Sequence, residues 1–82
     1  MMIEEVGEHL LAERTNCAAV GEWIIRVARN AYPIGDVRWF ARADGYAFFP
    51  SAFPTALSPD RLREIAQFCS DKTNVHKRLR RK

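Results

Sequence analysis

The sequence predicts a small α+β domain with the element order α-α-β-β-α, in which a β-hairpin packs on helices. Three observations lead to this prediction. Two apolar and aromatic runs flank Asp44-Gly45, apolar residues recur at helical spacing toward both ends of the chain, and six of the thirteen Lys and Arg residues fall in the last eleven positions. The 82 residues suffice for a single domain, expected over 1–71, with a basic C-terminal tail or a frayed helical extension over 72–82.

The first helix is expected at about 2–13. Ile3, Val6 and Leu10 recur with the spacing of one helical face. Several glutamates lie off that face near the start of the segment, where negative charge favours a helix N-terminus.

A second helix is expected at about 17–31. Six apolar residues there fit one helical face, and Glu22 and Arg26 form an i, i+4 pair on the polar side. The run Trp23-Ile24-Ile25 also alternates as a strand would. A strand in this segment would give the order α-β-β-β-α, which is the element order of double-stranded RNA-binding domains.

The β-hairpin is expected at about 36–49, because the two apolar runs are joined by a short loop containing Asp44-Gly45, a pair that tolerates positive φ. Strand alternation gives the first run one apolar face and one aromatic and basic face. The residues of these faces are Val37, Trp39 and Ala41 on the first, and Arg38, Phe40 and Arg42 on the second.

The third helix is expected at about 59–71 and begins with Ser58-Pro59-Asp60. Serine is a good N-cap, proline loses no hydrogen bond at the first helical position, and an acid suits the positive end of the helix dipole. The expected buried stripe consists of Leu62, Ile65, Ala66 and Cys69, with Phe68 beside it.

Composition argues against several classes of protein. No apolar run approaches the roughly 20 residues of a membrane span, and the N-terminus lacks the features of a secretory signal, so we expect a cytoplasmic protein with free thiols. The Cys and His residues lack zinc-ligand spacing, and no nucleophile elbow or phosphate-binding glycine loop is present. We therefore expect no metal, no cofactor and no enzymatic activity. Cys17 and Cys69 are expected to be small hydrophobic residues on helical stripes.

Binding to nucleic acid is the first functional hypothesis. Phosphate contacts need clustered cations, and the chain offers ten candidates: Arg26, Arg29, Arg38, Arg42, Lys72, Lys77, Arg78, Arg80, Arg81 and Lys82. Two helices followed by a hairpin, over residues 5–50, resemble the layout of winged helix-turn-helix proteins such as small phage excisionases. That resemblance implies a small regulatory DNA-binding protein.

Binding to protein is the alternative hypothesis. The chain has more aromatic side chains than a small core needs, and aromatic residues with arginine are typical of interface cores. The candidate interface residues are Tyr32, Trp39, Phe40, Phe49 and Phe53. The protein would then be an adaptor or inhibitor that docks on a larger host protein, of the kind that phages and mobile elements carry. A second copy of the chain is a further candidate partner, because sheet edges can pair.

Overall fold

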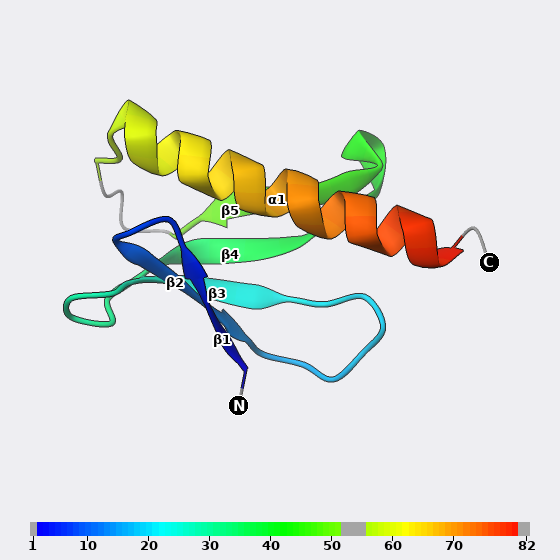
Figure 1. The fold of residues 1–82 in the computed structure, drawn as a ribbon, viewed down its shortest axis with the longest axis horizontal. Helices are drawn as coiled ribbons and strands as arrows, with labels where there is room; N and C mark the ends of the chain where they lie inside the picture. Colours follow the sequence, from blue (N-terminus) through cyan, green and yellow to red (C-terminus); the bar gives the residue numbers. More distant parts are fainter. Residues whose placement is uncertain (1, 52–55, 81–82) are drawn as a thin grey trace.

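The protein consists of a five-stranded antiparallel sheet and one long helix that crosses one face of it (Figure 1). The structure is a computed structural model, which describes residues 2–51 and 56–80. The elements are β1 (Ile3–Val6), β2 (Leu10–Arg14), β3 (Trp23–Val27), β4 (Pro33–Phe40), the short 3-10 helix η1 (Ala41–Ala43), β5 (Gly45–Pro50) and α1 (Pro59–Arg80). Strands that follow one another in sequence are neighbours in the sheet. The α+β class is therefore confirmed, whereas the order α-α-β-β-α is wrong.

The segment 2–13 forms the hairpin β1–β2, not the predicted helix. The chain reverses at Gly7, whose φ of 66° lies in the left-handed region that favours glycine. Val6 and Leu10 are directly paired across the hairpin and are both buried. Residues four apart share a face in a helix, and the two residues flanking a three-residue turn share a face in a hairpin, so this apolar pattern suits both structures.

The segment 17–31 contains a loop followed by β3, so the prediction of a second helix is also wrong. Trp23 and Ile25 are buried beneath α1, while Ile24 and Arg26 point to the other face, as strand alternation requires. Cys17 lies exposed in the loop and not on a helical stripe. The winged-helix layout and the order α-β-β-β-α both fail, because each requires a helix where β1 and β2 lie.

The predicted hairpin is confirmed as the pair β4–β5, in which Asp36 lies opposite Phe49 and Phe40 opposite Gly45. Its first strand starts earlier than expected, at Pro33. The first strand also ends earlier than expected, at Phe40. Ala41 and Arg42 belong to η1, so they are not part of the two predicted strand faces. Asp44 follows with a φ of 50°, which returns the chain into β5.

Helix α1 begins where the capping residues predict. The Oγ of Ser58 accepts a hydrogen bond of 3.3 Å from the backbone N–H of Arg61, and the helix starts at Pro59. It continues to Arg80 and so takes in most of the stretch expected as a tail or helical extension. Within residues 2–51 and 56–80, no helix has both the length and the apolar character to cross a membrane.

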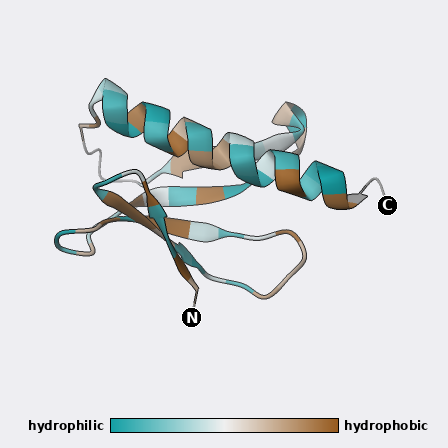
Figure 2. Cartoon of the chain, viewed as in Figure 1, coloured by the Kyte–Doolittle hydropathy of each residue, from teal (hydrophilic) through white to brown (hydrophobic). Residues whose placement is uncertain are grey.

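The core lies between α1 and the sheet, where Figure 2 shows hydrophobic segments of the strands below the helix. Trp23 is at its centre and meets Tyr46 and Phe68 edge-on, with ring centroids 5.3 and 5.4 Å apart. The buried residues of α1 are Ile65, Phe68 and Cys69. The predicted stripe is wrong at Leu62, which is 50% exposed, and at Ala66, which is also exposed, because α1 presents a narrower face to the sheet.

Candidate interaction surface on the open face of the sheet

The face of the sheet opposite α1 is not covered by any other described element (Figure 1). Side chains on it alternate along each strand with the buried core residues, and the antiparallel register brings them into rows across the sheet. We call this surface the open face. Its residues are Ile3, Glu5, Leu11, Glu13, Ile24, Arg26, Asp36, Arg38, Phe40, Ala47 and Phe49.

An aromatic and arginine cluster occupies the β4–β5 part of the open face. The rings of Phe40 and Phe49 meet edge-to-face with centroids 5.9 Å apart. The guanidinium carbon of Arg38 lies over the Phe49 ring, 4.0 Å from its centroid, which is a cation–π contact. Phe40 is 40% exposed and the Arg38 side chain 45% exposed, so the cluster is ordered by its own contacts and still accessible.

Apolar side chains extend the open face toward β1. Leu11 and Ile24 are half-buried, and Ile3 is 55% exposed. The solvent side of an antiparallel sheet is usually polar, with a clean alternation of apolar and polar residues along each strand. The open face departs from that rule on several neighbouring strands, and exposed apolar surface of this kind marks interaction sites.

The charges of the open face largely neutralise one another. Arg26 donates from Nε to Glu13 at 2.9 Å and from Nη1 to the carbonyl of Ala31 at 3.1 Å. Arg38 lies 3.9 Å from a carboxylate oxygen of Asp36. With Glu5 the face has three carboxylates and two guanidinium groups, so it is not an electropositive surface.

The structure separates the four predicted interface residues that it describes. Phe40 and Phe49 lie on the open face, whereas Trp39 points to the other side and packs beneath α1 against Tyr46 and His76. Trp39 therefore lies apart from Phe40 and Phe49, because the alternation of side chains along β4 places it on the side of the core. Tyr32 is 47% exposed in the turn between β3 and β4. Phe53 lies outside the described residues.

The predicted phosphate-binding cations whose side chains are described also do not form one surface. Arg26 and Arg38 are on the open face, and Arg29 borders a cavity with Arg61 near the start of α1. Lys72 lies on the opposite side of the sheet, where its Nζ contacts both carboxylate oxygens of Glu4 at 2.7 and 2.8 Å. Because 17–31 forms a loop, β3 and a turn in place of a helix, there is no common helix face on which Arg26 and Arg29 could lie together.

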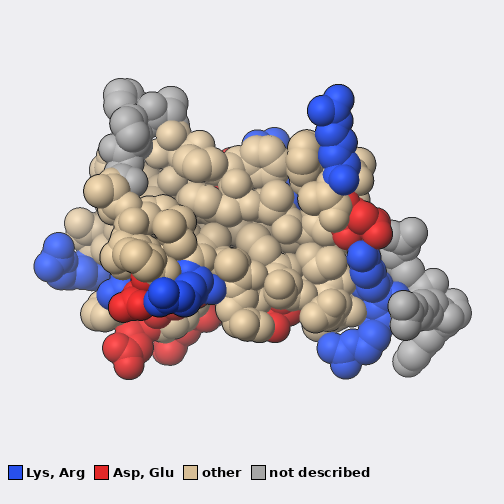
Figure 3. Space-filling view, turned by 90° about the horizontal axis from the view of Figure 1, so that it is seen from above, with Lys and Arg blue, Asp and Glu red and all other residues tan. Residues whose placement is uncertain are grey.

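A smaller group of cations gathers where α1 ends. Lys77 contacts Asp44 at 2.9 Å, which brings η1 with Arg42 to the same end as the exposed Arg78. Figure 3 shows Lys and Arg side chains concentrated at that end, with a second group at the opposite end. Arg80 ends α1, and the predicted cations Arg81 and Lys82 lie outside the described residues.

Two contributors to the open face, Leu11 and Ile24, were not among the predicted site residues. Both were assigned to helices, and only a strand places them beside Arg26 and Glu13. For Ile24, the alternation from Trp23 to Val27 was the signal in the sequence. Among the described residues, no three His, Cys, Asp or Glu side chains are placed to hold a metal ion.

Comparisons with protein-family models, curated proteins and solved structures found no significant match for this chain. Functional inference therefore rests on the geometry of the residues themselves.

Proposed function

We propose that this protein is a non-enzymatic binding module that docks on a larger protein through the open face. The observation that carries the proposal is the cluster of Arg38, Phe40 and Phe49 on a sheet face that no other described element covers. Aromatic and arginine side chains are enriched at protein interfaces, because aromatic rings bury large apolar areas and arginine combines an apolar stem with a guanidinium group. The half-buried Leu11 and Ile24 supply the apolar surround of such a contact.

The charge of the open face supports a protein partner over a nucleic acid. Phosphate binding depends on cations that are free to replace counterions. Both arginines of the face have carboxylate neighbours, and the carboxylates outnumber them. Balanced charges around an apolar and aromatic centre are typical of the rim and core of a protein interface.

Affinity capture from nuclease-treated lysate tests the proposal. The baits are the wild-type chain, the double variant Phe40→Ser/Phe49→Ser, and Leu62→Ser as a matched control. Leu62 is an exposed apolar residue of α1, on the covered side of the sheet. The single variant Arg38→Ala serves where the double variant fails to fold, as judged by circular dichroism.

We expect wild type and Leu62→Ser to capture the same protein at a fixed stoichiometry, and the open-face variants to lose it. The largest losses should approach the ~2 kcal/mol of an interface hot spot, which is about 30-fold in affinity. A partner retained equally by the open-face variants, or released by nuclease, contradicts the proposal.

The cations at the end of α1 support a second candidate function, binding of nucleic acid at that end. Arg42, Lys77 and Arg78 converge there, and the sequence continues with three further cations. Asp44 offsets only part of this positive charge. The C-terminal end of α1 therefore stays strongly positive, which suits contact with a phosphate backbone.

A titration of labelled duplex and single-stranded DNA against salt tests this second candidate. Replacing Arg42, Lys77 and Arg78 by Gln should weaken binding to all sequences alike and lower the salt slope by about 1 for each phosphate that the variant no longer neutralises. The double variant Lys77→Gln/Arg78→Gln is compared with the matched control Arg29→Gln/Arg63→Gln, which removes two cations near the other end of α1. Binding that is absent at low salt, or that does not respond to salt, rules the candidate out.

A further inference from the structure

Strand β1 forms one edge of the sheet, because β2 is the one described strand with which it pairs. The backbone N–H of Arg14 donates to the carbonyl of Met2 at 2.9 Å, so this carbonyl points toward β2. Backbone groups alternate in direction along a strand, so those of Ile3 and Glu5 point away from the sheet. Both residues are exposed, and the edge therefore offers two N–H and two C=O groups that no described strand pairs.

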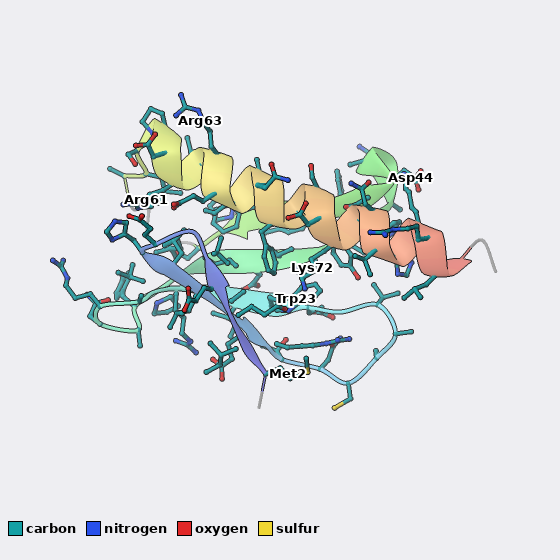
Figure 4. All side chains as sticks on the ribbon, viewed as in Figure 1. Met2, Trp23, Asp44, Arg61, Arg63 and Lys72 are labelled. Carbon is teal, nitrogen blue, oxygen red and sulfur yellow. The ribbon has the colours of Figure 1, made fainter. Side chains whose placement is uncertain are left out.

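A groove of about 220 Å³ lies beside this edge, between β1 and α1. Figure 4 shows β1 running from Met2 toward the end of α1 that carries Arg61. Val6 and Phe68 form the apolar part of the groove and are 3% and 8% exposed. The polar side chains of α1 that line it are Glu64, Gln67 and Asp71. An engineered cavity of about 150 Å³ takes up benzene, so a groove of this volume has room for the alkyl stem of a long side chain.

The surroundings of the groove carry an excess of negative charge. Glu4 is paired with Lys72, and Glu64 is paired with Arg61. In contrast, neither Glu5 nor Asp71 has a described Lys or Arg side chain within ion-pair distance, and Asp71 accepts a hydrogen bond of 2.9 Å from the neutral Gln67. The Glu5 side chain is on the open face and Asp71 lines the groove, so an unbalanced carboxylate lies on each side of the edge.

This charge argues against a second copy of β1 as the strand that occupies the edge. Only registers that set Ile3 and Glu5 opposite their own kind or each other allow the outward backbone groups to pair. The two such registers that match three residues of each β1 place identical glutamates directly opposite, Glu4 in one and Glu5 in the other. Like charges in that position destabilise a sheet, whereas a strand that carries Lys or Arg gains from opposite charges.

We propose that the β1 edge binds a basic, extended segment of another polypeptide, which adds to the sheet as a further strand antiparallel to β1. Its backbone pairs with Ile3 and Glu5, as in other complexes formed by strand addition. A lysine or arginine side chain of the segment enters the groove, where its alkyl stem packs on Phe68 and its charge reaches Asp71. The aromatic and arginine cluster lies toward the other edge of the sheet, so the proposal does not rest on the function proposed for the open face.

Titration of the ¹⁵N-labelled protein with a synthetic peptide tests this site. The probe is acetyl-Thr-Lys-Val-Lys-Val-Lys-Thr-amide, in which strand alternation places the lysines on the side of the groove and the valines on the side of Ile3. One control peptide has glutamate in place of each lysine. A second has backbone N-methyl groups on both valines, which removes the donors that face β1 in an antiparallel pair. A third has N-methyl groups on two lysines, whose backbone donors face away.

We expect the unmodified peptide to move the amide resonances of Ile3 and Glu5 downfield and to slow their exchange with solvent, with saturation at roughly 1 mM. The glutamate and N-methylvaline peptides should bind about 10-fold more weakly, and the N-methyllysine peptide should bind as the unmodified one does. Asp71→Asn should lower the affinity about threefold. Its matched control Glu22→Gln, which removes an exposed acid from the β2–β3 loop, should leave the affinity unchanged.

Three results would overturn the proposal. The first is a peptide titration in which the amides of Ile3 and Glu5 do not respond. The second is equal binding of the unmodified peptide and either the glutamate or the N-methylvaline peptide, because charge or backbone pairing would then play no part. The third is a dimer in sedimentation that Glu5→Pro dissociates, since proline removes an outward N–H and a second copy would then occupy the edge.

Discussion

Gly35 in β4 is a residue at which one added carbon atom has a large structural effect. A Cβ there would lie 2.5 Å from the backbone carbonyl oxygen of Phe49 and 2.6 Å from the ring of Phe48. Neither neighbour is the free end of a flexible chain, since the carbonyl belongs to β5 and the ring packs against the core. Overpacking of this kind distorts the backbone or forces side chains out of their preferred rotamers.

We therefore expect Gly35→Ala to lower the free energy of unfolding by about 2 kcal/mol, as measured by urea denaturation. Ala47→Ser provides the control, because Ala47 lies on β5 with its side chain on the open face. That change should alter stability by less than about 0.5 kcal/mol. Equal stability of Gly35→Ala and wild type would contradict the tight β4–β5 packing.

The two cysteines should differ in reactivity toward a thiol reagent. Cys17 is exposed in the β2–β3 loop, and Cys69 is buried on the inner side of α1. Burial raises the pKa of the Cys69 thiol above its usual value of 9.0, so the reactive thiolate is scarce there. We expect one thiol to be labelled rapidly in the native protein and the second only on unfolding. Cys17→Ser should abolish the rapid phase, and rapid labelling that persists in this variant would contradict the burial of Cys69.

The same pKa shift makes a small contribution to stability that depends on pH. The native state holds the Cys69 proton to a higher pH than the unfolded chain does. The contribution is complete below pH 9.0, the pKa of the unfolded thiol, and is lost as pH rises toward the raised native pKa, because ionisation then favours the unfolded chain.

At the level of the elements, a single hydroxyl group joins α1 to the edge strand β5. The Oγ1 of Thr73 accepts a hydrogen bond of 2.8 Å from the backbone N–H of Tyr46 and donates one of 2.7 Å to the carbonyl of Cys69. An edge strand presents unpaired backbone donors, and this hydroxyl satisfies one of them. Gly45 permits the close approach, since a Cβ there would lie 3.0 Å from the Thr73 side chain.

Thr73→Val keeps the shape of the side chain but removes the hydroxyl, and leaves the Tyr46 N–H without its acceptor. We expect a loss of about 1–2 kcal/mol in the free energy of unfolding, together with faster hydrogen exchange at the Tyr46 amide. Thr73→Ser keeps the hydroxyl and should retain the protection of that amide. Unchanged exchange in Thr73→Val would show that this hydrogen bond does not hold α1 on β5.

The elements differ in how far the sequence predicted them. The start of α1 and the β4–β5 hairpin were predicted correctly. Ser58-Pro59 strongly favours a helix start and Asp44-Gly45 strongly favours a turn, and both preferences depend only on neighbouring residues. The N-terminal hairpin was missed, because a three-residue turn at Gly7 places Val6 and Leu10 on one face, as a helix also would. Only the sheet, a long-range structure, decides between these alternatives.

The residues of the candidate site were predicted only where the strands that carry them were predicted. Phe40 and Phe49 were predicted as interface residues and Arg38 as a phosphate contact, and the structure brings the three together because they lie on the hairpin that was predicted correctly. Leu11 and Ile24 were missed because their strands were assigned to helices. Trp39 was placed on the apolar face of the hairpin, which is the face that α1 covers, while its assignment to the interface set rested only on its aromatic character.

For the whole molecule, the two faces of the sheet have separate roles in this account. One face holds α1 and the core, and the other exposes Arg38, Phe40 and Phe49, where we propose that a partner docks. The basic end of α1 lies away from the open face. A partner that uses the open face should therefore leave the exposed residues of α1 largely unchanged.

Backbone amide spectra of the ¹⁵N-labelled protein, recorded with and without the captured partner, show directly whether the partner docks on the open face. We expect shift changes and protection from solvent to concentrate on the open face, around Ile24, Arg38 and Phe49, while the outer surface of α1 around Leu62 and Arg63 stays as in the free protein. Changes concentrated on α1 or around Arg42 and Lys77, with the open face unaffected, would contradict this expectation.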